Sequence, residues 1–323
     1  MLTTLVYRDH RLAGHNPPAE SLASLKAEPN VTLWLDLSAP TPAEITLVLE
    51  LLFAFHPLVV EDCTTDNPVP KLEFYDDYLF LIMHAVDYSK TDKFTTTELD
   101  LMLGKNFLVT LHRQPLRAVQ NVIERYQRTP HTIVRGPDRL AHTLLDQIID
   151  AYKPALHELR DDLEGIEEDV LGHISPEELF PRIVDLRKEL AQLRQIVRPQ
   201  HQIVAELAQG KARLIRPVIL PYLRDLAEDL GRIESQAIGW AEQLILTFKV
   251  YLNKNGHEAN QGIRILTALT ALTLPPFILA GWYGMNFSHM PELGTLAGYP
   301  MVALLMIGAT TAMFFLLKKK GWL

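Results

Sequence analysis

The sequence predicts an α+β fold: an N-terminal α/β domain, followed by long stem helices and two C-terminal transmembrane helices. No Asp, Glu, Lys or Arg occurs between Ile265 and Met290, and after Glu292 the chain is again uncharged until Lys318. Each of these spans is long enough to cross the bilayer core as a helix of about 20 residues. Before the spans, the apolar residues first follow the patterns of strands and short helices, and from Asp138 they follow the period of long helices.

The first part of the chain carries both strand and helix signals. Residues 31–37 alternate apolar residues with polar or aromatic ones, which is typical of a strand. Thr41, Pro42 and Glu44 supply an N-cap, a proline in the first turn and a capping-box glutamate, so a helix is expected to begin there. The expected elements are a strand at 31–37, a helix at 41–55, long strands at 71–87 and 95–113 with a turn near Asp92, and a helix after Pro115.

Long helices are expected from Asp138 onward. The first two cover 138–173 and 176–209, and Ser175 with Pro176 gives a start signal for the second. A third begins near Pro221 and meets no strong stop before Pro275. If it continues to Gly284 it has over 60 residues, or about 95 Å at 1.5 Å per residue. A helix of that length cannot be buried within one subunit, so it must pack against copies of itself or against partner helices.

The basic residues predict the orientation in the membrane. They flank the two spans on the same side, and the loop between the spans carries none, which places both termini in the cytoplasm. The N-terminus has no apolar signal segment that would send the large domain outward, so the expected location is the cell (inner) membrane. The expected organisation is a cytosolic α/β domain at 1–130, a cytosolic helical stem at 131–262, a first transmembrane helix at 263–286, an external loop at 287–298, a second transmembrane helix at 299–318 and a basic cytosolic tail at 319–323.

Composition excludes several classes of function. A net charge of −8 without a basic domain argues against nucleic acid as a partner. Cys63 is the only cysteine, which excludes an internal disulfide framework and a thiolate zinc cluster. The sequence contains no catalytic triad, P-loop or nucleotide fingerprint, so no catalytic residues are assigned and the protein is not expected to be an enzyme.

Motifs at both ends of the chain resemble those of one known family. Gly284, Met285 and Asn286 end the first span, and Met290, Pro291, Glu292 and Leu293 follow in the loop. The N-terminal segments 56–62, 76–80 and 106–113 are similar to that family's segments in the same order. The chain therefore resembles the CorA family of magnesium and other divalent metal-ion transporters, within the CorA/ZntB superfamily and with its GMN motif.

The resemblance implies a funnel-shaped homopentamer in which five copies of the long helix line one central pore. Gly284, Met285 and Asn286 would form the selectivity filter, where the Asn286 carbonyl accepts hydrogen bonds from water bound to Mg²⁺, an ion that gives up its water reluctantly. Glu292 would attract cations at the outer mouth. Counting back by three or four residues gives the expected pore lining: Asn260, Ile263, Leu266, Thr270, Leu274, Phe277 and Gly281.

The same resemblance implies a regulatory metal site in the cytosol. Glu61 and Asp62 match an acidic pair at the edge of the α/β domain, and Asp225 matches a stem aspartate of the neighbouring subunit. A divalent ion bound between them would hold the closed state.

The function expected from the resemblance is passive influx of Mg²⁺, with Co²⁺ and Ni²⁺ as further ions. A ZntB-like Zn²⁺ transporter, with or without proton coupling, is the second alternative, because Ser288 stands where many magnesium transporters of the family carry glutamate. A non-conducting membrane-anchored sensor is the third alternative. The sequence leaves open the physiological ion, the coupling, the control of the gate by cytosolic metal and the pore register around Phe277.

Overall fold

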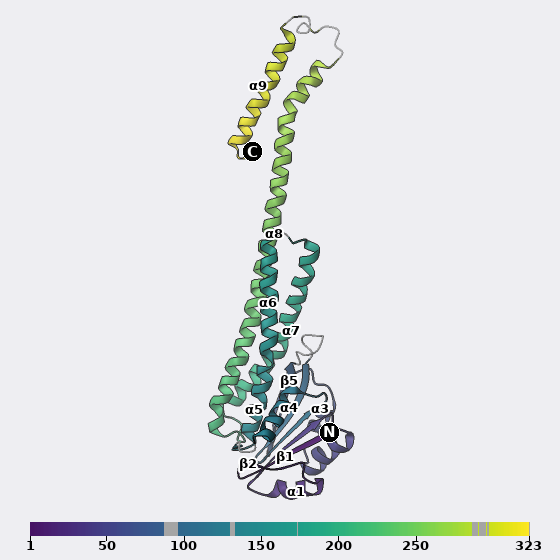
Figure 1. Cartoon of the computed structure of the whole chain (residues 1–323), viewed down its shortest axis with the longest axis vertical. Helices are drawn as coiled ribbons and strands as arrows, with labels where there is room; N and C mark the ends of the chain where they lie inside the picture. Colours follow the sequence, from purple (N-terminus) through teal and green to yellow (C-terminus); the bar gives the residue numbers. More distant parts are fainter. Residues whose placement is uncertain are drawn as a thin grey trace. The chain divides into compact units, whose positions relative to one another are not determined.

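The computed structural model describes residues 1–86, 96–129, 133–172, 174–285, 290, 295 and 297–322. The chain forms two compact units, Met1–Thr247 and Phe248–Leu323. Figure 1 colours the chain from purple at the N-terminus to yellow at the C-terminus.

The first unit contains a seven-stranded sheet among its described residues, in the order β2-β1-β3-β7-β6-β5-β4. β3 and β7 pair in parallel, and the other neighbouring strands pair antiparallel. The strands are β1 (Leu2–Arg8), β2 (Arg11–His15), β3 (Val31–Ser38), β4 (Lys71–Phe74), β5 (Tyr78–Val86), β6 (Thr96–Gly104) and β7 (Phe107–His112).

Helices cover both faces of the sheet. One face packs under α1 (Ala19–Ala27), the π-helix η1 (Thr46–Leu52) and α3 (Pro57–Thr64), with Leu22, Leu49 and Val59 in its core. The other face packs against α5 (Pro137–Asp150) and α7 (Pro176–Ala208), and α4 (Arg117–Arg128) packs on α5. Because both faces are covered, the central strands are apolar on both sides, as all nine residues of β5 show by being buried.

The structure confirms some expected elements and corrects others. The strand at 31–37 is β3, and Thr41 caps α2 (Pro42–Ile45) with the expected capping box. The prediction of two long strands was wrong, because each of these segments contains two shorter strands. In place of the strand expected at 71–87 the structure has β4 and β5 around a turn at 75–77, and in place of the strand expected at 95–113 it has β6 and β7 around a turn at 105–106. The helix at 138–173 is also divided, into α5 and α6 (Tyr152–Leu171), at Ala151.

Three long helices build the rest of the first unit. Each of α6, α7 and the first part of α8 (Leu220–Tyr283) buries one stripe of apolar residues at helical spacing, such as Leu159, Leu163 and Ile166 on α6. Polar contacts join them. Glu167 of α6 accepts hydrogen bonds from Gln243 and Thr247 of α8, and His201 of α7 lies 3.1 Å from Glu234 of α8.

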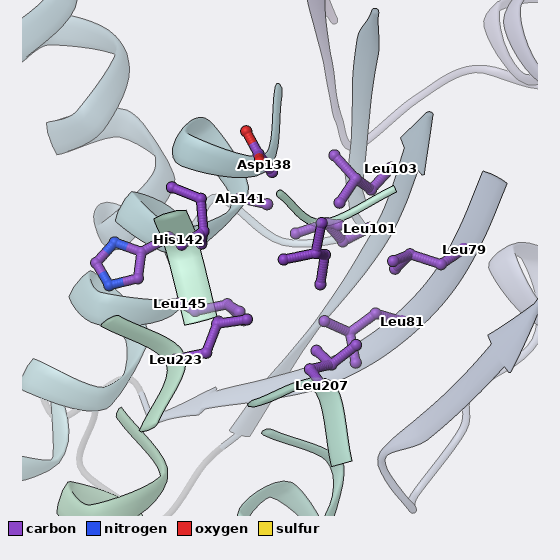
Figure 2. A pocket seen from close by; sticks show the side chains of 12 residues that line it. Leu79, Leu81, Leu101, Leu103, Asp138, Ala141, His142, Leu145, Leu207 and Leu223 are labelled. Atoms are coloured by element: carbon purple, nitrogen blue, oxygen red, sulfur yellow. The ribbon is translucent and has the colours of Figure 1, made fainter. Parts of the chain in front are cut away.

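Figure 2 shows the apolar interior between the sheet and these helices. Leu79, Leu81, Leu101 and Leu103 of the sheet face Leu145, Leu207 and Leu223 of the helices. The cavity among them is about 20 Å³, which is room for about one water molecule. The His142 ring points away from these leucines in Figure 2. This interior is therefore packed core and not a ligand site.

The second unit contains the end of α8 and the helix α9 (Gly298–Lys319). The expected third stem helix is confirmed, since α8 is one helix of 64 residues. Among the described residues, two helices contain windows apolar enough for a membrane span, with mean hydropathy of 1.7 in the longer helix and 2.1 in α9. Only 6% of each window is buried within the chain, which distinguishes both helices from the core helices of a soluble protein.

Candidate pore and regulatory sites

The GMN segment begins where α8 ends. α8 stops at Tyr283, the Gly284 N–H donates to the Ala280 carbonyl at 2.9 Å, and the Met285 N–H donates to the Trp282 carbonyl at 3.3 Å. A Cβ added at Gly284 would lie 2.9 Å from the Ala280 oxygen. Because that oxygen belongs to the backbone, it cannot move aside cheaply, so only glycine fits this helix end. Asn286 lies outside the described residues.

The seven residues expected to line the pore share one face of α8 and are exposed in the chain. At 100° per residue they fall within about 120° of the helix circumference. Phe277 is 78% exposed, and a Cβ at Gly281 would meet nothing within 4 Å. The face consists of Asn260, Ile263, Leu266, Thr270, Leu274, Phe277 and Gly281, and it carries no charge.

The opposite side of α8 faces α9. Leu279 and Tyr283 of α8, with Met301, Val302 and Leu305 of α9, line an apolar cavity of about 450 Å³. Leu279 lies two residues from both Phe277 and Gly281, and Tyr283 lies two residues from Gly281. Two residues correspond to a rotation of about 200° around a helix. α9 therefore occupies the side away from the uncharged face, and that face is left for contacts outside the chain.

Acceptor groups interrupt the apolar character of this part of α8. The Thr270 hydroxyl donates to the Leu266 carbonyl at 2.9 Å, so its proton is used and its oxygen remains an acceptor. Pro275 and Pro276 lie inside α8 and lack N–H groups, so the carbonyls of Ala271 and Leu272 have no donor four residues on. Of these acceptors the Thr270 oxygen lies on the uncharged face, where it suits a hydrated cation, whereas Leu272 lies two residues further, on the opposite side of the helix.

Glu292, which was expected to attract cations, and Ser288, which stands where a glutamate was expected, lie outside the described residues.

The expected regulatory carboxylates lie on two elements of the first unit. Glu61 and Asp62 belong to α3, and Glu61 is exposed. The Asp62 carboxylate is 2.7 Å from the Lys71 ammonium, which also lies 2.9 Å from Glu73. The negative charge of Asp62 is thus partly compensated, and Glu61 is the freer acid of the pair.

Asp225 lies on α8 and is exposed. It acts electrostatically on His142 and Asp146 of α5. Burial, then the charge of Asp150 and that of Asp225, raise the pKa of the Asp146 carboxyl above its ordinary value. Burial and the nearby Arg139 lower the pKa of the His142 ring.

The structure does not bring the three regulatory candidates together within one chain. Among the described residues, no group of three His, Cys, Asp or Glu side chains could hold a metal ion. Sequence reasoning missed Lys71 as the partner of Asp62 and Asp146 as the neighbour of Asp225. A signal existed for Asp146, because His142, Asp146 and Asp150 recur every four residues on one face of α5.

The chain is similar to known proteins over nearly all of its length. The family model described as CorA-like Mg²⁺ transporter protein matches residues 29–319. YfjQ of Bacillus subtilis is 29% identical over 320 residues, which cover 99% of this chain and 97% of that protein. The cobalt/magnesium transport protein CorA of Thermotoga maritima is 28% identical over 294 residues, which cover 90% of this chain and 83% of that protein.

A solved structure shares the fold. The CorA magnesium transporter from Methanocaldococcus jannaschii matches with a TM-score of 0.79 at 21% identity, covering 99% of this chain and 98% of that chain. The match includes both units.

Proposed function

Because this chain belongs to the family of CorA-like Mg²⁺ transporter proteins, we propose that it carries Mg²⁺ passively into the cell through a central pore formed by five copies of the chain. Members of this family transport divalent metal ions and are not enzymes. The observation that carries the proposal is the uncharged face of α8, which is exposed in the single chain, faces away from α9 and leads to Gly284 and Met285, the residues that precede Asn286 in the sequence.

The pore would pass Mg²⁺ with much of its water shell. Mg²⁺ dehydrates reluctantly, so a ring of Asn286 carbonyls would accept hydrogen bonds from bound water instead of replacing it. Further along, the Thr270 oxygen offers an acceptor of the same kind. A neutral lining holds the ion weakly enough to release it, and Leu266 and Ile263 supply an apolar constriction that can close by losing its water.

The membrane potential would drive the ion inward. With both termini in the cytoplasm, the GMN segment and Glu292 lie at the outer mouth, and a negative interior favours entry. The driving free energy is about 4.6 kcal/mol for a divalent ion per 100 mV. No co-transported ion is needed, although Zn²⁺ transport and proton coupling are the alternatives that the experiment must separate.

Ion uptake into proteoliposomes tests the proposal. Mg²⁺, Co²⁺, Ni²⁺ and Zn²⁺ are offered singly and in competition, with and without a pH gradient. We expect Mg²⁺ uptake that Co²⁺ and Ni²⁺ compete with and that a pH gradient leaves unchanged. Uptake restricted to Zn²⁺, or uptake that requires the pH gradient, would favour the ZntB-like Zn²⁺ transporter instead. The absence of any uptake would favour a non-conducting membrane-anchored sensor.

The filter residue provides the matching variant. Asn286→Ala removes the acceptors for the hydrated ion, so Mg²⁺ uptake should fall at least tenfold while the assembled oligomer persists, the loss of one hydrogen bond to a charged group being worth roughly 1.5–3 kcal/mol. Uptake and the elution volume in size-exclusion chromatography are measured on the same preparation. Wild-type uptake by an assembled Asn286→Ala variant would remove the filter role from this residue.

A further inference from the structure

The first unit contains a cavity far from the pore in sequence that transport does not explain. It has a volume of about 640 Å³, within the usual range for small-molecule sites. Its walls come from the segment after α1, the turn between β6 and β7, the start of α5 and the connection between α7 and α8. The cavity is thus built by four separate segments of one compact unit.

Uncompensated positive charge gathers around this cavity. Lys105, Arg135 and Arg213 line it, and within the described part of the chain none of the three has an ion pair. The two carboxylates of the lining are already engaged: Glu28 is 2.8 Å from Arg8, and Asp138 is paired with Arg216. Three free cations around one cavity are unexpected in a chain of net charge −8, since they repel one another unless an anion is present.

The backbone beneath these side chains is fixed. The Arg216 guanidinium donates to Asp138 at 2.8 and 2.5 Å and to the Arg135 carbonyl at 2.6 Å, which holds the α7–α8 connection against the start of α5. A Cβ at Gly136 would lie 2.9 Å from the Arg216 guanidinium, so a side chain there would displace the guanidinium from this position. In the β6–β7 turn, the Asn106 amide donates to the Lys26 carbonyl at 2.8 Å. The cationic side chains therefore extend from a rigid frame.

We infer that this cavity binds a soluble phosphate compound with at least two phosphate groups, of the size of a nucleoside di- or triphosphate. Guanidinium and ammonium groups bind phosphate oxygens by charge-assisted hydrogen bonds, and arginine can do so with two parallel bonds. Cations on three separate segments are arranged for more than one phosphate group. The apolar residues Ala27, Pro29 and Leu214 of the lining offer a surface for the rest of the ligand.

The cationic side chains would supply most of the phosphate binding at this site, and the backbone N–H groups at the start of α5 would contribute little. Pro137 has no N–H, and the Arg139 and Leu140 N–H groups donate to the Gly136 carbonyl. A bound phosphate compound would connect the α/β sheet with the segment that enters α8. Its concentration in the cytoplasm could then be coupled to the position of that segment.

Direct binding to the purified full-length protein tests the inference without reference to transport. Radiolabelled ATP is measured by equilibrium dialysis in detergent, without divalent ions, with pyrophosphate and adenosine as competitors. We expect saturable binding that pyrophosphate displaces, that adenosine does not displace, and that weakens with salt. No saturable binding at about 10 mM ATP, or displacement by adenosine but not by pyrophosphate, would overturn the inference.

Matched variants locate the binding. Lys105→Gln with Arg213→Gln should weaken ATP binding at least about tenfold, because two charge-assisted contacts are lost. The control is Lys188→Gln with Arg187→Gln, which removes the same charges from exposed positions of α7 and should leave binding unchanged. Equal weakening of ATP binding in the two double variants would show that ATP is attracted by the overall positive charge and not by this cavity, which would overturn the inference.

Two further measurements complete the test. All four positions are exposed, so both double variants should melt like the wild type, and Lys105→Arg should retain binding because it keeps the charge. Vesicles of phosphatidylglycerol should displace ATP no better than vesicles of phosphatidylcholine. Selective displacement by phosphatidylglycerol would assign the cavity to a lipid headgroup and contradict a soluble ligand.

Discussion

Gly284 and Asp100 illustrate how single residues constrain the two units of this protein. The backbone oxygen of Ala280 leaves no room for a side chain at position 284, so glycine is required there for steric reasons and not for a positive φ angle. Asp100 is fixed by burial: it is 1% exposed on β6 and faces α3, and within the described residues its Oδ1 atom has no hydrogen-bond donor. Each position therefore has a specific consequence when it is changed.

Gly284→Ala should reduce Mg²⁺ uptake at least tenfold without unfolding the protein. The added Cβ would approach the Ala280 oxygen to 2.9 Å, so the turn that leads into Asn286 must shift. A misplacement of about 1 Å in a positioned site is enough for a loss of this size. Gly308→Ala on α9 is the control, because its Cβ would meet nothing within 4 Å. Equal uptake by the two variants would contradict the steric argument.

Asp100→Asn should stabilise the protein more at pH 8 than at pH 5. Burial and then the neighbouring Glu98 raise the pKa of the Asp100 carboxyl well above its ordinary value of 3.8, against a smaller opposing effect of Cys63 and Arg113. An acid whose pKa is raised in the folded state adds stability that is complete below the unfolded pKa and is lost as the pH rises through the folded pKa. Asparagine does not titrate, so it removes this loss.

Thermal melting of the full-length protein in detergent across this pH range checks the prediction. The difference in Tm between Asp100→Asn and the wild type should grow steadily with pH. Parallel curves would show that Asp100 does not change its protonation differently in the folded and unfolded states.

At the scale of elements, the connection between α7 and α8 depends on one ion pair whose carboxylate is buried. The Asp138 side chain is 2% exposed, and it accepts hydrogen bonds from the Arg216 backbone N–H, the Arg216 guanidinium and the Arg139 N–H. In Figure 2 Asp138 lies on the first turn of α5, beside the apolar interior. A charge in this position is stable only while its partner remains.

Arg216→Ala should lower the free energy of unfolding by about 3 kcal/mol, at the lower end of the range for breaking a buried pair, because the Arg216 side chain is 42% exposed. Asp138→Ala combined with Arg216→Ala should cost less than the sum of the two single changes. Urea unfolding of the four proteins in a double-mutant cycle measures this coupling. Strictly additive effects would show that the pair does not act as a unit.

Local signals predicted elements where polar and apolar residues mark the boundaries. The capping box at Thr41 and the serine cap at Ser175 depend on neighbours within three residues, and the structure contains both. The division of β6 from β7 was missed because these strands are buried on both faces, so a nearly continuous apolar run crosses the short turn at 105–106. The ion pair between Asp138 and Arg216 joins residues 78 positions apart in the sequence, so no local sequence pattern predicts it.

At the scale of the whole molecule, the sequence predicted best those features that the membrane constrains most strongly. A membrane span requires a long uncharged run, so both apolar helices could be predicted from composition. The face proposed to line the pore could be predicted only by helical period, and its residues are exposed in the single chain. The proposed regulatory site could not be worked out in this way, since its candidate residues lie on α3 and α8 and would meet only between copies of the chain.

Asp225→Ala should weaken the inhibition of uptake by internal Mg²⁺. If Glu61 and Asp62 of one subunit face Asp225 of the next, their carboxylates repel until a divalent ion binds, and the bound ion favours the closed pore. Because Lys71 already compensates Asp62, Glu61 and Asp225 would contribute most of the negative charge. The internal Mg²⁺ concentration for half-inhibition should rise by about fivefold or more, the lower end of typical coupling between sites.

The same change should reduce the protection that Mg²⁺ gives against proteolysis and leave the order of transported ions unchanged, because we propose that this order is set at Asn286, 61 residues further along the chain. Asp185→Ala, an exposed aspartate of α7, is the matched control and should keep wild-type inhibition. Uptake is measured in proteoliposomes with the internal Mg²⁺ fixed at a series of concentrations. Unchanged inhibition in Asp225→Ala would rule out its role in the gate, whereas an altered ion order would place Asp225 in the conduction path instead.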